Sequence, residues 1–570
     1  SHLMALAVSE LFSEVRLGIG PPTSEGFYYD FQTPHRFTIE DLGRIEEKMR
    51  ELKSRDLHFG PSIINKEQAI ELFSESAEEL KVELIEERSN EVMSCYKLGE
   101  LVDFCKGPHV VSTALIGSFK LLSIAGSYWK GDETREQLQR IYGTAFFEER
   151  ELEDYLERLE QARKRDHRRL GKDLQLFSIE ENVAPGLIFW HPKGALVRGI
   201  IEGFMRRELE SHGYEFVYTP QIAKSDLWKT SGHYDYFLEN MYTLPVGEEE
   251  YVLKPMNCPG HILIYKSVKH SYRDLPIRLA EFGTVYRYEK SGTLHGMLRV
   301  RGFTQDDAHI FCRPEQVLDE VVQTLDLAKH ILESFGFDQY EVNLSVWDPE
   351  KPEHYSGTEE NWRKAEAVLV EALRLKGWKY KRCEGEAAFY GPKIDISLID
   401  VLGRSWQLST FQFDFSLPKR FNVTYVGSDS KEHHVIMVHR ALLGSLERFM
   451  GVLIEHYGGG FPVWLAPVQA VIIPVSDRHH EYAIQLEAQL KDSEAGLMRV
   501  NADLRNEKVG YKIREAQLQK VPYMLIVGDR EIEAGTVAVR NRIEGDQGTM
   551  TIQQFSKLIV DLVDTKAVKP

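Results

Sequence analysis

The stretch EFGTVYRYEKSGTLHGMLRVRGFTQDDAHIFC, from Glu281 to Cys312, decides the fold of this chain. It contains His309, and two other residues able to bind a metal lie far away in sequence, Cys258 in LKPMNCPGH and His439 in HHVIMVHRALLGSLERF. Zinc binds thiolate sulfur and imidazole nitrogen, and three protein ligands leave its fourth position open. Taken singly, each residue is typical of a packed core, and no local C-x-x-C or H-E-x-x-H spacing supports a metal. Together, and with the residues around them, the three suggest a zinc-dependent enzyme that uses a nucleotide.

The same stretch resembles motif 2 of the class II aminoacyl-tRNA synthetases, with Arg287 and Glu289 in a first strand and Phe303 in a second. GSLERF, at 444–449, is similar to motif 3, and Pro220 in FVYTPQI is similar to motif 1. CPG, QDDAH and MVHRA narrow the resemblance to the threonyl-tRNA synthetases, and it runs over nearly the whole chain. It implies a multidomain α+β and α/β protein with an antiparallel-sheet catalytic core, an N-terminal α+β editing-type domain and a C-terminal α/β anticodon-binding domain with a mixed sheet.

Length and composition set the outer limits. At 570 residues the chain exceeds the size at which one hydrophobic core stops growing, so about three or four domains are expected. Its hydrophobic content of 42% is ordinary, and no apolar run approaches the ~18 residues of a membrane helix. Five cysteines argue against a disulfide framework and, with no visible signal peptide, favour the cytoplasm. The net charge of −18 alone argues against a nucleic-acid partner, but a large acidic enzyme can still carry local basic surfaces.

Composition shifts predict four parts. Residues 1–135 mix helical stretches such as IEDLGRIEEKMRELK with β-rich pieces such as FKLLSIAG, and are expected to form the editing-type domain. Residues 136–172 are expected to be a helical connector, and residues 173–463 hold every motif of the catalytic core. A Gly-Gly-Gly run before Pro462 precedes residues 464–570, where strands such as VQAVIIPVS and YMLIVGD alternate with helical segments.

The connector sequence at 149–170, ERELEDYLERLEQARKRDHRRL, is expected to form one highly charged helix with a narrow apolar stripe. Its end carries five basic residues among seven positions, namely Arg163, Lys164, Arg165, Arg168 and Arg169. A solvated helix face is the favoured interpretation of this basic run, and contact with an RNA backbone is the alternative.

The resemblance places the zinc ligands on Cys258, His309 and His439. Threonine carries a hydroxyl where valine has a methyl, and an apolar pocket separates such near-isosteres poorly. A metal that chelates the amino group and the hydroxyl separates them, since valine leaves a coordination position unfilled. The implied threonine contacts are Met256, Gln305, Asp307, Tyr390 and Gln412; for Asp307 a turn or helix cap is the alternative. Serine lacks only a methyl, a difference of roughly 1–3 kcal/mol, so hydrolytic correction is needed.

The implied reaction joins a carboxylate to the α-phosphorus of ATP, and guanidinium groups and Mg²⁺ suit the charge that accumulates. Arg287, Arg448 and Lys393, the last in AFYGPKID, are the expected catalytic residues, with ordinary salt bridging as the alternative for the arginines. Glu289 is expected to accept from the adenine amino group and Phe303 to stack on its ring. The implied ATP site comprises Arg287, Glu289, Arg299, Phe303, Gln407, Thr410 and Arg448. No P-loop or G-x-G-x-x-G occurs, which is consistent with a class II site.

DFCKGPHVV places Cys105 and His109 four residues apart, and the Gly-Pro between them argues against a continuous helix. The resemblance assigns this motif to a domain that hydrolyses Ser-tRNA and pairs it with an H-x-x-x-H sequence near the domain start. Further editing positions are Tyr29, Lys81 and Asp103.

The chain departs from the family pattern at its start, SHLM. Only the second histidine of the pair can be present, as His2, either because the chain is trimmed inside the motif or because a tag remnant supplies it. From this start, we expect the chain to lack the upstream ubiquitin-like domain common in bacterial relatives. We therefore expect a recognisable editing fold with impaired activity and without a resident zinc.

The segment at 505–542, RNEKVGYKIREAQLQKVPYMLIVGDREIEAGTVAVRNR, resembles the anticodon-binding domain shared by threonyl-, prolyl-, histidyl- and glycyl-tRNA synthetases. RNA loops are recognised by side chains that hydrogen-bond to the edges of splayed bases. Asn506, Glu531 and Arg540 fall at the family's anticodon contacts, and surface charge without a ligand is the alternative.

The resemblance thus implies an enzyme that activates L-threonine with ATP and Mg²⁺, transfers it to tRNA(Thr), carries one zinc per subunit and forms a homodimer through motif 1. Prolyl or seryl specificity is a first alternative, disfavoured by the zinc positions and the Cys105 motif. A non-catalytic paralogue that binds tRNA or a metabolite as a regulator is a second, disfavoured because Arg287 and Arg448 remain. A zinc hydrolase is a third, and no general-base motif supports it.

Overall fold

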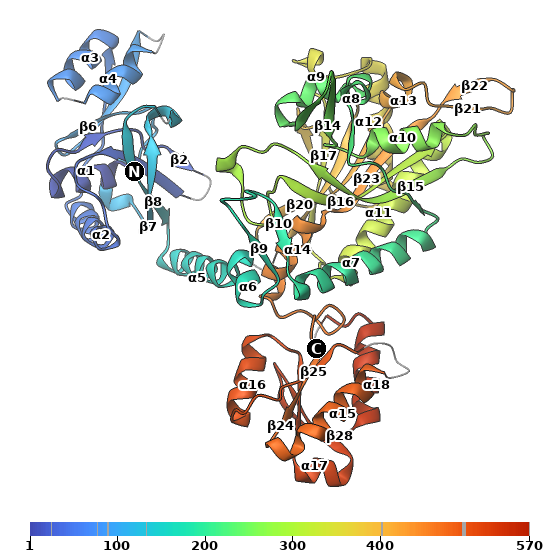
Figure 1. The fold of residues 1–570 in the computed structure, drawn as a ribbon. Coiled ribbons are helices and arrows are strands. Elements are labelled where there is room, and N and C mark those ends of the chain that lie inside the picture. Colours follow the sequence, from blue (N-terminus) through green and yellow to red (C-terminus); the bar gives the residue numbers. More distant parts are fainter. Residues whose placement is uncertain are drawn as a thin grey trace. The chain divides into compact units, whose positions relative to one another are not determined.

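The computed structural model describes residues 1–23, 26–76, 78–87, 91–132, 134–400, 403–492 and 498–568. The chain forms two compact units, Ser1–Glu160 and Gln161–Pro570 (Figure 1). Within the described ranges, no helix is long and apolar enough to cross a membrane.

The first unit is an α+β structure with two sheets. The larger sheet has the strand order β1-β3-β8-β7 with β2 beside β3, and helices α1 and α2 share its hydrophobic core, which includes Leu6, Phe31 and Ile45. The smaller sheet has the order β4-β5-β6 and forms a separate core with α3 and α4. The elements are α1 His2–Leu11, β1 Arg16–Leu17, β2 Pro22–Thr23, β3 Gly26–Gln32, α2 Ile39–Ser54, β4 Gly60–Asn65, α3 Lys66–Glu75, α4 Glu79–Glu86, β5 Val92–Leu98, β6 Leu101–Phe104, β7 Ser118–Tyr128 and β8 Gln137–Phe146.

The connector is two helices, α5 (Glu149–Arg165) and α6 (His167–Asp173), where the sequence predicted one. Asp166 ends the first helix because its backbone leaves the helical region, with φ −51° and ψ 119°. Its carboxylate then accepts a 2.8 Å hydrogen bond from the Arg168 N–H, which caps the second helix. At least three of the five basic residues have structural partners: Arg168 pairs with Asp166, Arg169 pairs with Asp173, and Arg165 donates to the carbonyl of His456.

The second unit is built on an eight-stranded sheet of order β11-β15-β16-β23-β20-β19-β17-β18. Its inner strands are antiparallel, and only the two edge strands, β11 and β18, pair in parallel with their neighbours. The strands are β11 Glu215–Phe216, β15 Ile277–Tyr286, β16 Gly302–Cys312, β17 Tyr340–Val346, β18 Lys381–Glu384, β19 Lys393–Ile399, β20 Ser405–Asp414 and β23 Ile436–Ser445. The sheet confirms the predicted antiparallel core.

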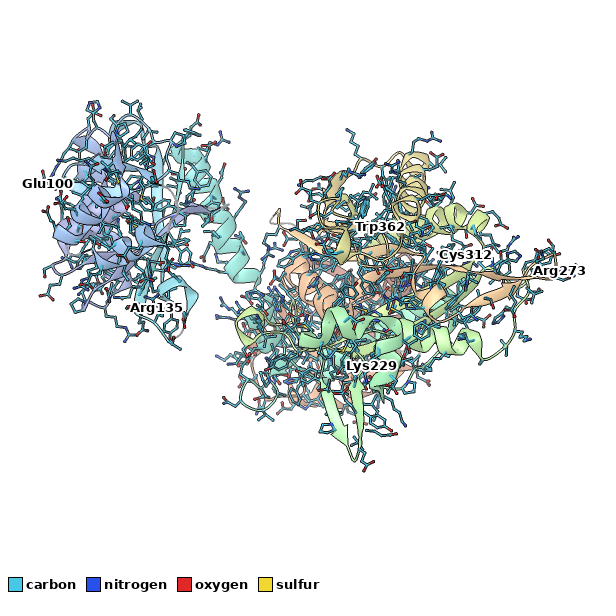
Figure 2. All side chains as sticks on the ribbon, turned by 90° about the horizontal axis from the view of Figure 1, so that it is seen from above. Glu100, Arg135, Lys229, Arg273, Cys312 and Trp362 are labelled. Atoms are coloured by element: carbon cyan, nitrogen blue, oxygen red, sulfur yellow. The ribbon has the colours of Figure 1, made fainter. Side chains whose placement is uncertain are left out.

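Alternation along the strands separates a packed face from a polar face. Ile310, Phe411 and Leu442 point into the hydrophobic core that the sheet shares with the helices. Trp362, labelled in Figure 2, belongs to the same core and lies against Phe415 with ring centroids 5.6 Å apart. The helices are α7 Pro192–Ser211, α11 Val317–Ser334, α12 Glu359–Lys376 and α14 Leu446–Tyr457.

Smaller elements complete this part of the second unit. Helix α10 is the most important of them, because Cys258 is its first residue and Pro259 its next, a position where proline's missing N–H costs no helical hydrogen bond. The small elements are β9 Phe177–Ile179, β10 Ile188–Trp190, β12 Ile222–Lys224, α8 Ser225–Ser231, α9 His233–Phe237, β13 Thr243–Val246, β14 Glu249–Leu253, α10 Cys258–Lys266, α13 Leu417–Arg420, β21 Thr424–Val426 and β22 Glu432–His434.

The C-terminal part has a mixed five-stranded sheet of order β25-β24-β26-β27-β28, as the sequence predicted. Strand β24 pairs in parallel with β25 and β26, whereas β27 pairs antiparallel with β26 and β28. Helices α15 and α18 share one core with the sheet, and residues of α16 contribute to another. The elements are β24 Ala470–Pro474, α15 His480–Lys491, β25 Val500–Ala502, α16 Val509–Leu518, β26 Tyr523–Val527, α17 Asp529–Ala534, β27 Thr536–Asn541, β28 Gly545–Thr551 and α18 Ile552–Asp564.

Candidate active site

Strand register gathers the predicted site residues on the polar face of the large sheet. His309 on β16 lies opposite His439 on β23, and His439 lies opposite Gln412 on β20. Gln412 in turn lies opposite Lys393 on β19, so one row of side chains crosses four strands. Asp307, two residues from His309, belongs to the next row and faces the same way.

Cys258, His309 and His439 form a buried cluster in which the sulfur and one nitrogen of each imidazole lie within 4.8 Å of one another. Burial raises the pKa of the Cys258 thiol well above its usual value. One sulfur and two imidazole nitrogens are donors that zinc prefers, and a bound cation would favour the thiolate.

Hydrogen bonds fix which imidazole nitrogens carry protons. The Asp414 carboxylate accepts from His439 Nε2 at 2.8 Å, which leaves a lone pair on His439 Nδ1. The Glu281 carboxylate accepts from His261 Nε2 at 3.2 Å, and His261 Nδ1 then accepts from His309 Nδ1 at 2.9 Å. His309 Nε2 therefore also presents a lone pair, 3.0 Å from His439 Nδ1. Two lone pairs held face to face fit a shared cation, and such outer partners are typical of zinc-binding histidines.

The two neighbouring aspartates have different surroundings, and both lie in strand β16, not in a turn or helix cap. Asp306 accepts from the backbone N–H groups of Leu442 and Leu443, and burial raises its pKa to about 6. Asp307 lines the cavity beside the cluster of Cys258, His309 and His439, and accepts from Asn257 Nδ2 at 3.0 Å. Burial also raises the pKa of Asp307. Asp306 is thus a structural residue, whereas Asp307 faces the site.

A cavity of about 500 Å³ opens above this cluster. Tyr390 forms one wall: its hydroxyl donates a 2.5 Å hydrogen bond to Gln412 Oε1, and its ring stacks on His439 with centroids 4.9 Å apart. Met256 and Gln305 complete the set of predicted amino-acid contacts on the wall. A small polar ligand would therefore lie between these groups and the cluster of Cys258, His309 and His439.

An adjoining cavity of about 310 Å³ is lined by the predicted ATP residues, and it shares Arg287 and Gln305 with the first. Arg287 and Glu289 lie directly after β15, where the sequence predicted them inside the strand, because the chain leaves the sheet at Tyr286. The Arg287 guanidinium lies 5.1 Å from the Phe303 ring centroid, and burial lowers its pKa.

The opposite wall of this second cavity carries the other two arginines. Arg448 on α14 donates to the carbonyl of Leu298 at 3.0 Å and to that of Gln407 at 3.2 Å, and burial lowers its pKa. Arg299 pairs with Glu289 at 2.9 Å. Arg448 is thus held by neutral carbonyls, and Arg299 by one partly exposed carboxylate. The positive charge of the site is therefore not fully neutralised by the protein, and it can bind a phosphate chain.

Asp395 joins the predicted residues but was not itself predicted. Its Oδ1 accepts from Gln407 Nε2 and from Thr410 Oγ1, each at 2.8 Å, and its Oδ2 pairs with Lys393 Nζ at 2.9 Å. The period of two that places Lys393 at the site also places Asp395 there, so the signal was present in AFYGPKID. His261 and Asp414 were likewise missed, because second partners of a metal ligand carry no local motif.

In the first unit, the six predicted editing residues come together. Five of them line one cavity of about 770 Å³, and the sixth, Tyr29, lies directly behind it and is hydrogen-bonded to Asp103. Asp103 is the hub: it accepts from the Tyr29 hydroxyl at 2.5 Å, pairs with His2 Nε2 at 3.1 Å and forms a buried ion pair with Lys81. Burial alone would raise the pKa of Asp103, but Lys81 and His2 hold it well below its usual range.

Cys105 and His109 face the same cavity from the non-helical segment after β6. A hydrogen bond from His2 lowers the pKa of the Cys105 thiol. His109 Nε2 lies 2.8 Å from His2 Nδ1, and its ring stacks on Tyr96. Cys105, His2 and His109 also form a group able to bind a metal.

The three predicted anticodon residues lie on different elements of the C-terminal sheet domain. Asn506 is exposed just before α16. Glu531 on α17 accepts a 2.9 Å hydrogen bond from the Gly528 N–H, so it has a capping role of its own. Arg540 on β27 lies opposite Met524, and its buried Nε has no partner among the described residues.

Comparison with known families agrees with this architecture. Residues 242–457 match the class II tRNA synthetase core domain of the G, H, P, S and T types, and residues 469–562 match an anticodon-binding domain. Residues 93–142 match the second additional domain of threonyl- and alanyl-tRNA synthetases. The fold and the site thus define a class II aminoacyl-tRNA synthetase with an editing-type domain.

The chain is 55% identical over 570 residues to the threonine–tRNA ligase of Acidobacterium capsulatum, covering all of this chain and 83% of that protein. It is 49% identical over 571 residues to that of Aquifex aeolicus, covering 99% and 88%. The chain therefore belongs to the threonine–tRNA ligase family and is an ATP-dependent ligase. Prolyl or seryl specificity and the zinc hydrolase are set aside.

Solved structures give the same result. The structure titled as the RNA-binding domain of threonyl-tRNA synthetase from Cryptosporidium parvum is 43% identical, with a TM-score of 0.66, and the match covers 70% of this chain and 98% of that one. A putative threonyl-tRNA synthetase from Aeropyrum pernix is 30% identical, with a TM-score of 0.63 and coverage of 70% and 96%. Prolyl-tRNA synthetase from Giardia lamblia, at 18% identity and a TM-score of 0.56, shares the fold, with coverage of 72% and 81%.

Proposed function

We propose that the two adjoining cavities activate threonine: the threonine carboxylate attacks the α-phosphorus of ATP, and pyrophosphate leaves. A hydroxyl at the 3′ end of tRNA(Thr) then attacks the carbonyl of the threonyl-adenylate, takes the threonyl group and releases AMP. The observation that supports this best is the pair of imidazole lone pairs, on His309 and His439, beside Cys258 at the base of the first cavity. Zinc bound there would supply a Lewis-acidic position for the amino group and hydroxyl of threonine.

The protein residues have separate tasks in this scheme. Asp307 is positioned to accept from the side-chain hydroxyl, and Tyr390 with Gln412 to fix the amino acid. Arg287 and Arg448 would stabilise the charge on the α-phosphate and on pyrophosphate, together with Mg²⁺. Because both guanidinium groups are already oriented by carbonyls or a ring, little reorganisation is needed when charge develops.

ATP–pyrophosphate exchange with threonine, serine and valine, before and after zinc removal, tests this function. We expect exchange with threonine, weaker exchange with serine and negligible exchange with valine, all abolished by chelation and restored by zinc. Undiminished exchange in the zinc-free protein would contradict the metal's role. No exchange with any amino acid, in folded and zinc-loaded protein, would instead favour the regulatory paralogue.

We also propose that the cavity of the first unit hydrolyses Ser-tRNA(Thr), with Asp103 organising Tyr29 and Lys81. Deacylation of Ser-tRNA(Thr) is expected to fall on replacement of Asp103 by Asn, while pyrophosphate exchange is unchanged. The sequence predicts that editing activity is impaired in this chain. The rate at which the wild-type protein deacylates Ser-tRNA(Thr) tests that prediction, and rapid deacylation would contradict it.

A homodimer through the segment around Pro220 completes the proposal. Tyr218 and Ile222 flank that proline and are exposed, at 76% and 49%. Light scattering after size exclusion is expected to give twice the 65.7 kDa chain mass.

A further inference from the structure

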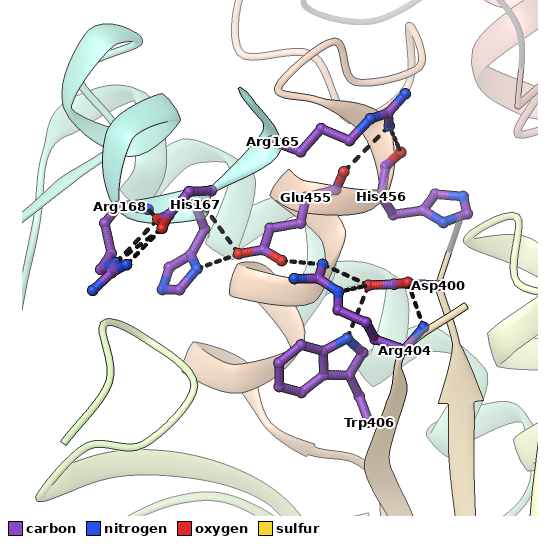
Figure 3. A network of polar contacts seen from close by, with 9 residues as sticks. Arg165, His167, Arg168, Asp400, Arg404, Trp406, Glu455 and His456 are labelled. Atoms are coloured by element: carbon purple, nitrogen blue, oxygen red, sulfur yellow. Dashed lines mark hydrogen bonds and ion pairs between the residues drawn. The ribbon is translucent and has the colours of Figure 1, made fainter. Parts of the chain in front are cut away.

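A buried polar network lies outside the site described above and joins α6 to α14 (Figure 3). At its centre, His167 Nδ1 lies 2.6 Å from Glu455 Oε1, and the same oxygen accepts from the His167 backbone N–H at 3.1 Å. Glu455 also pairs with Arg404, which forms a second ion pair with Asp400 at 2.6 Å. The His167 and Glu455 side chains are 0% and 3% exposed, so this central pair is shielded from solvent.

The second nitrogen of His167 reaches a different part of the molecule. His167 Nε2 lies 3.0 Å from the backbone nitrogen of Met297 and can only accept from this N–H. The proton of the ring is therefore on Nδ1, where the Glu455 carboxylate accepts it. Although Asp166, His167 and Glu455 lie close enough to hold a metal, this arrangement leaves no lone pair on His167 for one.

Met297 lies in the turn between β15 and β16 that ends at Arg299. The turn is closed by reciprocal hydrogen bonds between His295 and Arg299, at 3.1 and 3.2 Å. Leu298, the next residue after Met297, accepts from Arg448 Nε at 3.0 Å. The Met297–Leu298 dipeptide thus contacts His167 through Met297 and Arg448 through Leu298. Arg299, the second proposed ATP-binding arginine, follows this dipeptide directly.

Two glycines allow this close approach. A Cβ on Gly296 would lie 2.0 Å from His167 Nε2, and the residue has φ +52°, which favours glycine. A Cβ on Gly451 would lie 3.0 Å from the Leu298 side chain, and Gly451 is on α14 between Arg448 and Glu455. Helix α14 therefore holds the turn twice, through Arg448 directly and through Glu455 by way of His167.

We infer that His167 is a positioning residue for the ATP site: it holds the Met297–Leu298 dipeptide so that Arg299 and Arg448 meet the phosphates in a fixed geometry. The inference rests on the proposed ATP site, and it assigns a role to a connector residue that no motif marks. Loss of the Met297 contact would leave a buried N–H without an acceptor and release the turn.

Two substitutions separate the two contacts of the ring. In His167→Asn the amide nitrogen replaces Nδ1 and keeps the bond to Glu455, but nothing replaces Nε2. In His167→Gln the amide oxygen replaces Nε2 and keeps the Met297 acceptor. His456→Asn is the matched control, since His456 is an imidazole on α14 next to Glu455 and packs on Phe337.

We expect the KM for ATP in pyrophosphate exchange to rise about tenfold in His167→Asn, equivalent to about 1.4 kcal/mol, with the KM for threonine unchanged. His167→Gln and His456→Asn are expected to stay near wild type. An unchanged ATP KM in a folded His167→Asn protein, or an equal rise in both KM values, would overturn the inference.

If His167→Asn does not fold, Gly296→Ala disturbs the same contact from the turn and is expected to raise the ATP KM selectively. Arg448→Ala distinguishes an error in the proposed ATP site from an error in the role of His167. If Arg448→Ala leaves exchange unchanged, the proposed ATP site itself is wrong. If Arg448→Ala abolishes exchange and neither the His167→Asn nor the Gly296→Ala change alters the ATP KM, only the role of His167 is wrong.

Discussion

Asp414 accepts a 2.8 Å hydrogen bond from His439, and this contact determines which nitrogen of His439 is free to bind a metal. Asp414 Oδ1 also accepts from the backbone N–H groups of Ser416 and Leu417, so the carboxylate cannot turn away. The aspartate would therefore influence metal binding at the proposed zinc site without touching the metal, through the tautomer of the imidazole.

Asp414→Asn is expected to weaken zinc binding by about 10–100-fold. The asparagine oxygen can keep the two backbone contacts, which turns its NH₂ group toward His439 Nε2 and forces the imidazole proton onto Nδ1. Competition with a chromogenic chelator measures the affinity. Asp429→Asn is the control, because Asp429 makes a similar but exposed contact with His433, at 2.9 Å. Equal zinc affinity in both variants would contradict the prediction.

Tyr390→Phe is expected to raise the KM for threonine about tenfold and to leave the KM for ATP unchanged. The change removes the hydroxyl that holds Gln412 Oε1 and leaves that buried oxygen without its donor, while the ring can still stack on His439. Steady-state pyrophosphate exchange gives both constants. Tyr234→Phe, which removes a hydroxyl bonded to Glu250, serves as the control. A parallel rise in the ATP KM would show that Tyr390 acts on more than the amino acid.

Glu447→Gln is expected to stabilise the protein at pH 8 and to have no such effect at pH 5. Burial raises the pKa of Glu447 from 4.5 to about 7. Because the folded protein binds this proton more tightly than the unfolded chain, the protonated carboxyl contributes stability that is fully present below pH 4.5 and is lost as the pH rises through 7. The shift in pKa corresponds to a loss of about 3 kcal/mol in the free energy of unfolding. The Gln oxygen can keep the hydrogen bond from the Thr304 N–H. Melting temperatures of both proteins across this pH range provide the measurement, and a constant difference would refute it.

Much of the fold and site could be predicted from the family motifs and from the alternation of residues along strands. The family motifs, and not the alternation itself, predicted Gln305, Asp307 and His309 as site residues; the alternation explains why the structure places all three on one face of β16. It could not reveal that the strand before them ends at Tyr286, because strand ends depend on what the departing chain packs against.

Longer-range contacts escaped prediction for a different reason. His167 and Glu455 are 288 positions apart, and His261 meets His309 across 48 positions. Neither contact has a local pattern, since each depends on how separate elements are brought together. The basic run at 163–169 shows the same limit, because the carbonyl that Arg165 contacts belongs to a helix almost three hundred residues later.

Arg540→Ala is expected to raise the KM for tRNA(Thr) in aminoacylation about tenfold and to leave pyrophosphate exchange unchanged. Arg540 belongs to the C-terminal sheet, and its buried Nε lacks a partner in the described part of the chain, so the guanidinium has a donor that a ligand can use. A base edge of a splayed RNA loop can accept from that donor. Arg374→Ala controls for the loss of a cation, because Arg374 is exposed on α12 and pairs only locally with Glu371. If the exchange rate falls together with the tRNA affinity, Arg540 acts on folding and not on tRNA recognition; if neither changes, it is surface charge without a ligand.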